Sequence, residues 1–229
     1  MAATWTVVDP SLPALTHTYS FGPGTANALA LTVPDGVIVV SPPCNVADAV
    51  FVELEQRGPL KALIAPNAFH SMGLAPWKAR YPDVPIFAPP QSIGRLEKST
   101  KISGIRPVAE AAARIGDQVQ LVDMPHYKTG ELLVRWPVDG GWAWYLTDVA
   151  MNFAEVPPGL FGLVFKWTRS CPGLRRNALA GWFMVKDKRA LYAWLAEQAE
   201  KTPPRLVVPC HGGVVKTSDP VAEIRAAFA

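Results

Sequence analysis

Apolar and polar residues alternate with a period of two along the first 40 residues, which is the pattern of half-buried β-strands. Residues 16–21 and 27–33 follow this alternation, and residues 37–40 form an uninterrupted apolar run typical of a buried strand. The pair Asp35-Gly36 between the last two runs is a hairpin signal. The chain is therefore expected to begin with a β-meander.

The pattern then changes to helices of 3.6-residue period that alternate with short apolar strands. Residues 45–57 present one apolar face, Asn45 is expected to cap this helix, and Gly58-Pro59 ends it. The same reasoning predicts further helices over residues 71–80, 187–201 and 219–229, and strands over 60–65, 86–88, 119–122, 131–136, 142–146 and 206–208. Such alternation predicts the α/β class.

The 229 residues show no linker-like change in composition, so we expect a single domain over residues 1–229. Residues 154–182 are rich in aromatic residues and glycine, and we expect an irregular insertion or lid there. Trp167 and Trp182 border this segment and are candidates for lining a pocket.

The charge and the cysteine content indicate which partners and which cell compartment to expect. The formal charge is only +3 and the basic residues are scattered, so a nucleic-acid partner is not expected. No apolar stretch approaches the roughly 18 residues that span a bilayer, and residues 1–13 lack the pattern of a signal peptide. Three irregularly spaced cysteines predict free thiols. We expect a cytoplasmic protein without a membrane partner.

Four potential metal ligands follow predicted strands. His70, His126 and His211 each come after a strand-like run, and Asp148 follows residues 142–146. Loops at the carboxyl ends of strands converge in layered α/β folds, so these side chains are expected to meet. Imidazole and carboxylate together suit zinc, iron or manganese. The alternative is a hydrogen-bonded polar cluster without a metal. His17, in an alternating strand, is expected to have a structural or surface role.

The order of several segments resembles the metallo-β-lactamase superfamily over about residues 18–215. These segments are NALAL, GVIVVSPP, LIAPNAFHSMG, MPHYKTGELLV, WYLTD and VVPCHGG. In that family a strand ends in Thr-His-x-His-x-Asp-His, a later histidine lies in Pro-Gly-His-Thr-x-Gly, an aspartate ends another strand, and a last histidine lies in Gly-His-Gly. The resemblance implies a four-layer αβ/βα sandwich.

The resemblance assigns roles to the four candidates. It makes His126, in PHYKTG, and His211, in PCHG, metal ligands, and it makes Asp148 the bridging ligand that would also orient or deprotonate a water. The first motif is replaced by residues 66–72, PNAFHSM, where His70 is the one histidine left and Asn67 offers a weak ligand or a hydrogen bond. Ser41 stands where the family commonly has an aspartate that orders the ligand loop.

The loss of the first motif changes the expected function. A binuclear site is not expected, and at most one zinc, iron or manganese ion would be held by some of His70, His126, Asp148 and His211. Such a protein would hydrolyse an ester, lactone or amide of small-molecule size. The alternative is a catalytically inactive member that binds a ligand or a protein. Cys210, beside His211, is either a thiolate ligand or nucleophile, or a buried inert thiol.

Overall fold

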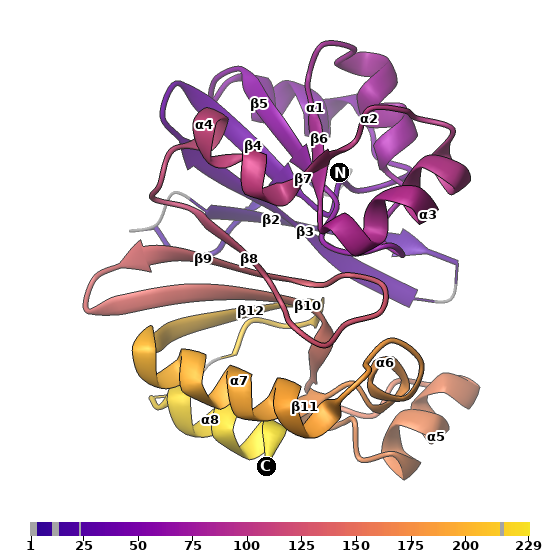
Figure 1. The fold of residues 1–229 in the computed structure, drawn as a ribbon, viewed down its shortest axis with the longest axis vertical. Coiled ribbons are helices and arrows are strands. Elements are labelled where there is room, and N and C mark those ends of the chain that lie inside the picture. Colours follow the sequence, from indigo (N-terminus) through magenta and orange to yellow (C-terminus); the bar gives the residue numbers. More distant parts are fainter. Residues whose placement is uncertain (1–3, 11–13, 23, 216–217) are drawn as a thin grey trace. The chain divides into compact units, whose positions relative to one another are not determined.

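The computed structural model describes residues 4–10, 14–22, 24–215 and 218–229, which form two compact units, Met1–Leu121 and Val122–Ala229 (Figure 1). Residues 1–3 and 11–13 of the N-terminal segment, in which no signal peptide is expected, lie outside the described residues. The expectation of one domain over residues 1–229 stays a prediction, since the units are described separately below.

The first unit is built on a seven-stranded sheet in the order β1 to β7. Strands β1 to β4 pair antiparallel and β4 to β7 pair parallel. The strands are β1 (Thr6–Val7), β2 (Ala14–Phe21), β3 (Gly24–Val33), β4 (Gly36–Val40), β5 (Leu60–Ile64), β6 (Ile86–Ala88) and β7 (Arg106–Pro107). The predicted meander is therefore the antiparallel half of the sheet.

The hairpin between β3 and β4 forms where Asp35-Gly36 predicted it. Val33 pairs with Gly36, so the loop is Pro34–Asp35, and Asp35 takes a positive φ of 61°. A Cβ at Gly36 would lie 2.1 Å from the Pro59 carbonyl oxygen, which leaves no room for any other residue there. This close approach fixes the start of β4 beside the start of β5.

Helices of the first unit are α1 (Asp48–Glu55), α2 (Leu74–Arg80), α3 (Pro90–Thr100) and α4 (Ala112–Ile115), with a 3-10 turn at Val108–Glu110. The prediction that Asn45 caps α1 is wrong. Asn45 lies upstream with φ 54°, and the N-cap is Ala47, which makes no side-chain hydrogen bond. Helix α3 was not predicted, and Pro90 lies in its first turn, where proline is well suited because that backbone N–H has no partner within the helix.

The second unit is built on a five-stranded sheet around the long strand β10. Antiparallel β9 pairs with the first half of β10 and antiparallel β11 with its end, while β12 runs parallel along it. The strands are β8 (Gln120–Asp123), β9 (Leu132–Val138), β10 (Gly141–Phe153), β11 (Gly173–Arg176) and β12 (Pro204–Gly212).

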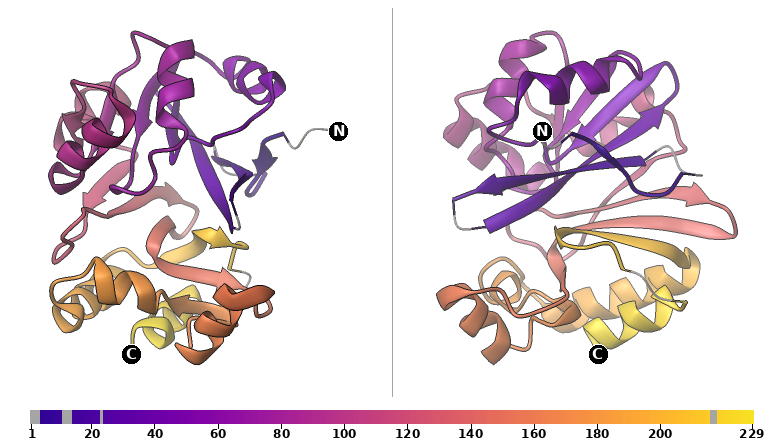
Figure 2. Two further views of the ribbon diagram at one scale, coloured as in Figure 1. Left: turned by 90° about the vertical axis from the view of Figure 1, so that its right-hand side faces the viewer. Right: turned by 180° about the vertical axis from the view of Figure 1, so that it is seen from behind.

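Two helices, α7 (Lys188–Lys201) and α8 (Pro220–Phe228), lie side by side against one face of this sheet (Figures 1 and 2). Leu191 and Leu195 of α7 and Ile224 of α8 join Trp144 and Val207 of the sheet in one buried cluster. Trp142 packs against the same cluster as Trp144, as expected for residues two apart on a strand. Asp187 and Asp219 cap α7 and α8.

The expectation of an irregular insertion over residues 154–182 is corrected. The segment contains α5 (Gly159–Trp167), β11 and most of α6 (Ala178–Phe183), so it is largely regular. Each unit thus combines a sheet with helices, which confirms the predicted α/β class. No helix among the described residues is both long and apolar enough to cross a membrane.

Candidate functional site

Strand β10 carries Asp148 within its length rather than past its end. Leu146 pairs with Pro209 of β12 and Met151 pairs with His211, so residues 147–150 of β10 lie opposite the single residue Cys210. This is a large bulge in the ladder. Bulges redirect side chains and are common beside functional sites. The strand predicted over residues 142–146 ends where the bulge begins.

The bulge brings Asp148 to His211. Asp148 Oδ1 lies 3.0 Å from His211 Nε2, and the two side chains are 12% and 14% exposed, so a small ligand can reach both. The backbone N–H of Asp148 donates to Glu131 Oε1 at 2.8 Å, and Glu131 is fully buried immediately before β9. A carboxylate next to a second strand therefore holds the backbone that carries Asp148.

The backbone after His211 is fixed by close approach to β10. Gly212 has a φ of 93°, and a Cβ there would lie 2.0 Å from the Asn152 carbonyl oxygen. The Asn152 side chain donates to the Gly213 carbonyl at 2.9 Å, and the Gly213 N–H donates to the Asn152 carbonyl at 2.9 Å. Gly212 thus lets β12 approach β10 closely enough to place His211 beside Asp148.

His126 does not join this pair. Its side chain is exposed, its φ is 65°, and its carbonyl accepts from the Lys186 N–H at 2.7 Å. A positive φ is the conformation that favours glycine. In the motif Pro-Gly-His-Thr-x-Gly, His126 therefore occupies the glycine position, and the next residue, Tyr127, occupies the histidine position.

Tyr127 is buried in the core cluster of the second unit, together with Trp144 and Val185. Burial raises the pKa of its phenol well above the ordinary value, and the negative charges of Glu131 and Asp148 raise it further. Tyr127 is therefore a neutral phenol at neutral pH, able to donate a hydrogen bond and unsuited to act as an anionic ligand.

Two more buried groups lie at the bulge. Cys210 is fully buried, and its Sγ lies within 4.8 Å of a ring nitrogen of His211. Thr147 is also fully buried, and within the described part of the chain its Oγ1 has no hydrogen-bond partner. The site on the second unit thus contains oxygen, nitrogen and sulfur donors together with one unsatisfied hydroxyl.

His70 belongs to the first unit, where side-chain hydrogen bonds hold its loop. The buried Asn67 Oδ1 accepts from the N–H groups of Phe69 and His70, at 2.8 and 3.1 Å. His70 Nδ1 lies 2.6 Å from Ser41 Oγ, which in turn lies 3.0 Å from the Tyr19 hydroxyl. Ser41 therefore contacts His70, the one histidine of residues 66–72. Asn67 makes hydrogen bonds, which is one of the two roles expected for it.

The structure thus brings together two of the four predicted residues, Asp148 and His211, on one unit. Sequence analysis missed Glu131 and Tyr127. A stricter alignment of PHYKTG with the family motif would have placed Tyr127 at the histidine position, whereas nothing in the sequence singles out Glu131. His17 is structural as expected: it is buried, and its Nδ1 lies 3.2 Å from the Thr4 carbonyl oxygen.

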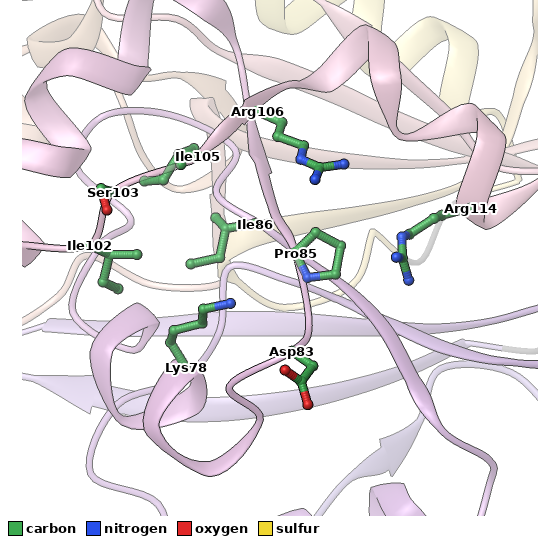
Figure 3. Close-up of a pocket in the computed structure, with 10 residues that line it drawn as sticks. Lys78, Asp83, Pro85, Ile86, Ile102, Ser103, Ile105, Arg106 and Arg114 are labelled. Carbon is green, nitrogen blue, oxygen red and sulfur yellow. The ribbon is translucent and has the colours of Figure 1, made fainter.

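A separate cavity of about 150 Å³ lies in the first unit. Figure 3 shows three basic side chains, Lys78, Arg106 and Arg114, around Pro85, with the single carboxylate of Asp83. The Lys78 ammonium donates to the Val84 carbonyl at 2.8 Å. None of the predicted ligand residues lines this cavity, so it is distinct from the site at Asp148.

Comparison with solved structures gives matches over nearly the whole chain. A metallo-β-lactamase from Pontibacter korlensis has a TM-score of 0.61 at 10% identity, covering 98% of this chain and 97% of that one. A metallo-β-lactamase from Erythrobacter litoralis has a TM-score of 0.61 at 14% identity, covering 98% and 91%. The metallo-β-lactamase FIM-1 from Pseudomonas aeruginosa in its mono-zinc form has a TM-score of 0.61 at 12% identity, covering 100% and 95%.

Comparison of the sequence alone is uninformative. No protein-family model matches it, and none of the curated proteins does. The similarity therefore lies in the fold.

Proposed function

We propose that this chain, which has the fold of the metallo-β-lactamases, is a hydrolase with a reduced, at most mononuclear, metal centre built around Asp148 and His211. The observation that carries this proposal is the 3.0 Å contact between Asp148 Oδ1 and His211 Nε2 at the bulge of β10. An imidazole and a carboxylate that are close together and partly exposed are the beginning of a metal site.

The donor atoms on the second unit fit one ion. Asp148 supplies oxygen, His211 nitrogen, and Cys210, with its Sγ within 4.8 Å of a His211 ring nitrogen, a third donor. Three protein ligands with one open position is the usual count for catalytic zinc, and this mixed set suits zinc better than manganese. Tyr127 argues against a second ion, because a neutral phenol occupies a position that the family fills with histidine.

Asp148 and Glu131 then have definite tasks. A bound ion would acidify a water molecule and polarise the carbonyl of an ester, lactone or amide. Asp148 would orient that water and take up its proton, and Glu131 fixes the Asp148 backbone. Tyr127 is a neutral phenol buried in the core cluster, and the proposal gives it no catalytic task. The ligand role of His70, a small-molecule substrate and a cytoplasmic location stay predictions, and this proposal gives His126 no ligand role because its side chain is exposed.

Metal analysis of the purified protein tests the proposal. After incubation with zinc and removal of the excess, we expect about one ion per chain, and at least a tenfold weaker zinc affinity in Asp148→Asn and in His211→Ala. His126→Ala is the matched control and should keep the ion, since its side chain is exposed. Retention of the ion by both site variants would contradict the proposal.

The second candidate is an inactive member that binds a ligand or another protein. One observation favours it: Asp148 and His211 already satisfy each other by a hydrogen bond, which needs no ion. In that case zinc would leave the thermal unfolding temperature unchanged, whereas a tightly bound ion raises it. Hydrolysis of ester, lactone and amide panels by the zinc-loaded protein separates the two candidates further.

A further inference from the structure

Helices α5 and α6 carry an exposed apolar surface, here called the α5–α6 patch. Within the described residues of the second unit, every exposed large hydrophobic side chain belongs to these two helices. The patch consists of Leu160, Leu163, Trp167, Trp182 and Phe183. Trp167 is 78% exposed, Leu160 77% and Phe183 74%. Contiguous apolar surface of this kind marks an interaction site.

The patch is one continuous surface. Leu160, Leu163 and Trp167 follow the spacing i, i+3, i+7, so they lie on one face of α5. The Trp167 and Trp182 rings meet edge to face with centroids 6.3 Å apart, which links the two helices. The opposite face of α5 is anchored to the unit, since Phe165 stacks on Phe153 at 6.1 Å. Figures 1 and 2 show α5 and α6 clustered beyond the end of β10.

The sequence segment that contains the patch is rich in basic residues. Residues 154–189 contain seven lysines and arginines against two acids, Glu155 and Asp187, which gives a net charge of +5. The rest of the chain has fifteen basic and seventeen acidic residues, so it is net negative. Lys166 and Arg169 flank Trp167 and are exposed. The net positive charge of the chain therefore lies in the sequence segment that contains the patch, and Lys166 and Arg169 place part of it beside Trp167.

We propose that the α5–α6 patch docks on an anionic lipid bilayer surface, with Leu163, Trp167 and Trp182 entering the interface and Lys166 and Arg169 facing the head groups. Tryptophan favours the boundary between head groups and acyl chains, and lysine and arginine gain free energy beside anionic lipids. The expectation of no membrane partner rested on the lack of a spanning stretch, which a surface that lies on the bilayer does not need.

Co-sedimentation with vesicles tests this inference on the full chain, with no metal required. We expect binding to phosphatidylcholine vesicles that contain roughly one-third phosphatidylglycerol, little binding to pure phosphatidylcholine, and weaker binding at high salt. Leu163→Ser should weaken the vesicle partition by about tenfold and Lys166→Glu by at least roughly fivefold.

Matched variants of other helices serve as controls. Val52→Ser on α1 and Lys98→Glu on α3 change an exposed apolar and an exposed basic residue outside the patch, and both should bind vesicles as the unchanged chain does. All four variants should unfold at the same temperature, because the side chains are exposed. No binding to anionic vesicles, or equal loss in patch and control variants, would overturn the inference. A dimer that Leu163→Ser converts to monomer, without vesicle binding, would also overturn it and indicate self-association.

Discussion

At the residue scale, the exchange of roles between His126 and Tyr127 has the largest effect on the proposed chemistry. The sequence places a histidine in the right loop, but backbone conformation decides which side chain is buried. His126 has a φ of 65° and is exposed, whereas Tyr127 is buried in the core cluster of the second unit. A backbone angle of this kind cannot be inferred from residue types alone, so the prediction identified the loop and the structure supplied the side chain.

Gly212 is the residue whose substitution should most directly disturb the site. We expect Gly212→Ala to lower the free energy of unfolding by about 2–4 kcal/mol, because its Cβ would overlap the Asn152 carbonyl and its φ is positive. Urea unfolding measures the change. The neighbouring Gly213→Ala is the control, since nothing lies within 4 Å of its Cβ, and its effect should be below about 1 kcal/mol. Equal effects at both positions would be inconsistent with close approach at Gly212.

Thr147 offers a test of the unsatisfied hydroxyl at the bulge. We expect Thr147→Val to be neutral or stabilising by up to about 1 kcal/mol, because it replaces a buried hydroxyl that lacks a partner within the described residues by a methyl group. In contrast, Thr202→Val should destabilise by about 1–2 kcal/mol, since its hydroxyl accepts from Arg135 at 2.7 Å and donates to Gln198 at 2.9 Å. A clear loss of stability in Thr147→Val would indicate that this hydroxyl has a role.

At the scale of elements, periodicity predicted most strands and helices. The elements that it did not predict in full depart from a regular pattern of buried and exposed residues. The alternation of residues 16–21 and the apolar run of residues 37–40 predicted strands of the meander, because burial alternates along most of β2 and β4 is buried throughout. The full lengths of β10 and β12 were not predicted, because the bulge at residues 147–150 interrupts the pairing that a simple pattern assumes. Helix α5 was missed because its exposed face is apolar, which conceals the amphipathic pattern.

Strand β2 provides a prediction on pH. Burial lowers the pKa of His17 below the ordinary 6.5, despite the Thr4 carbonyl and the charge of Glu53. The unfolded chain then binds more protons than the folded chain as pH falls below about 6.5, so folding stability should decrease there. Replacing His17 with Gln should remove this part of the decrease, as measured by urea unfolding from pH 7 to pH 5. An unchanged pH dependence would show that another group causes it.

At the scale of the whole molecule, the fold is better determined than the chemistry. The class and family resemblance followed from the order of segments along the chain, and the solved structures match over nearly its full length at 10–14% identity. Such low identity carries the fold but no activity, so the function depends on the few residues at the bulge. The proposed function requires that these residues bind one metal ion and no more.

X-ray absorption at the zinc edge of the zinc-loaded protein measures how many ions are bound and which atoms bind them. We expect one zinc per chain with nitrogen and oxygen ligands, sulfur when Cys210 coordinates, and no second metal nearby. The imidazole signal should disappear in His211→Ala. A metal–metal distance of roughly 3.5–4 Å, or a zinc spectrum unchanged by both Asp148→Asn and His211→Ala, would contradict the proposed function.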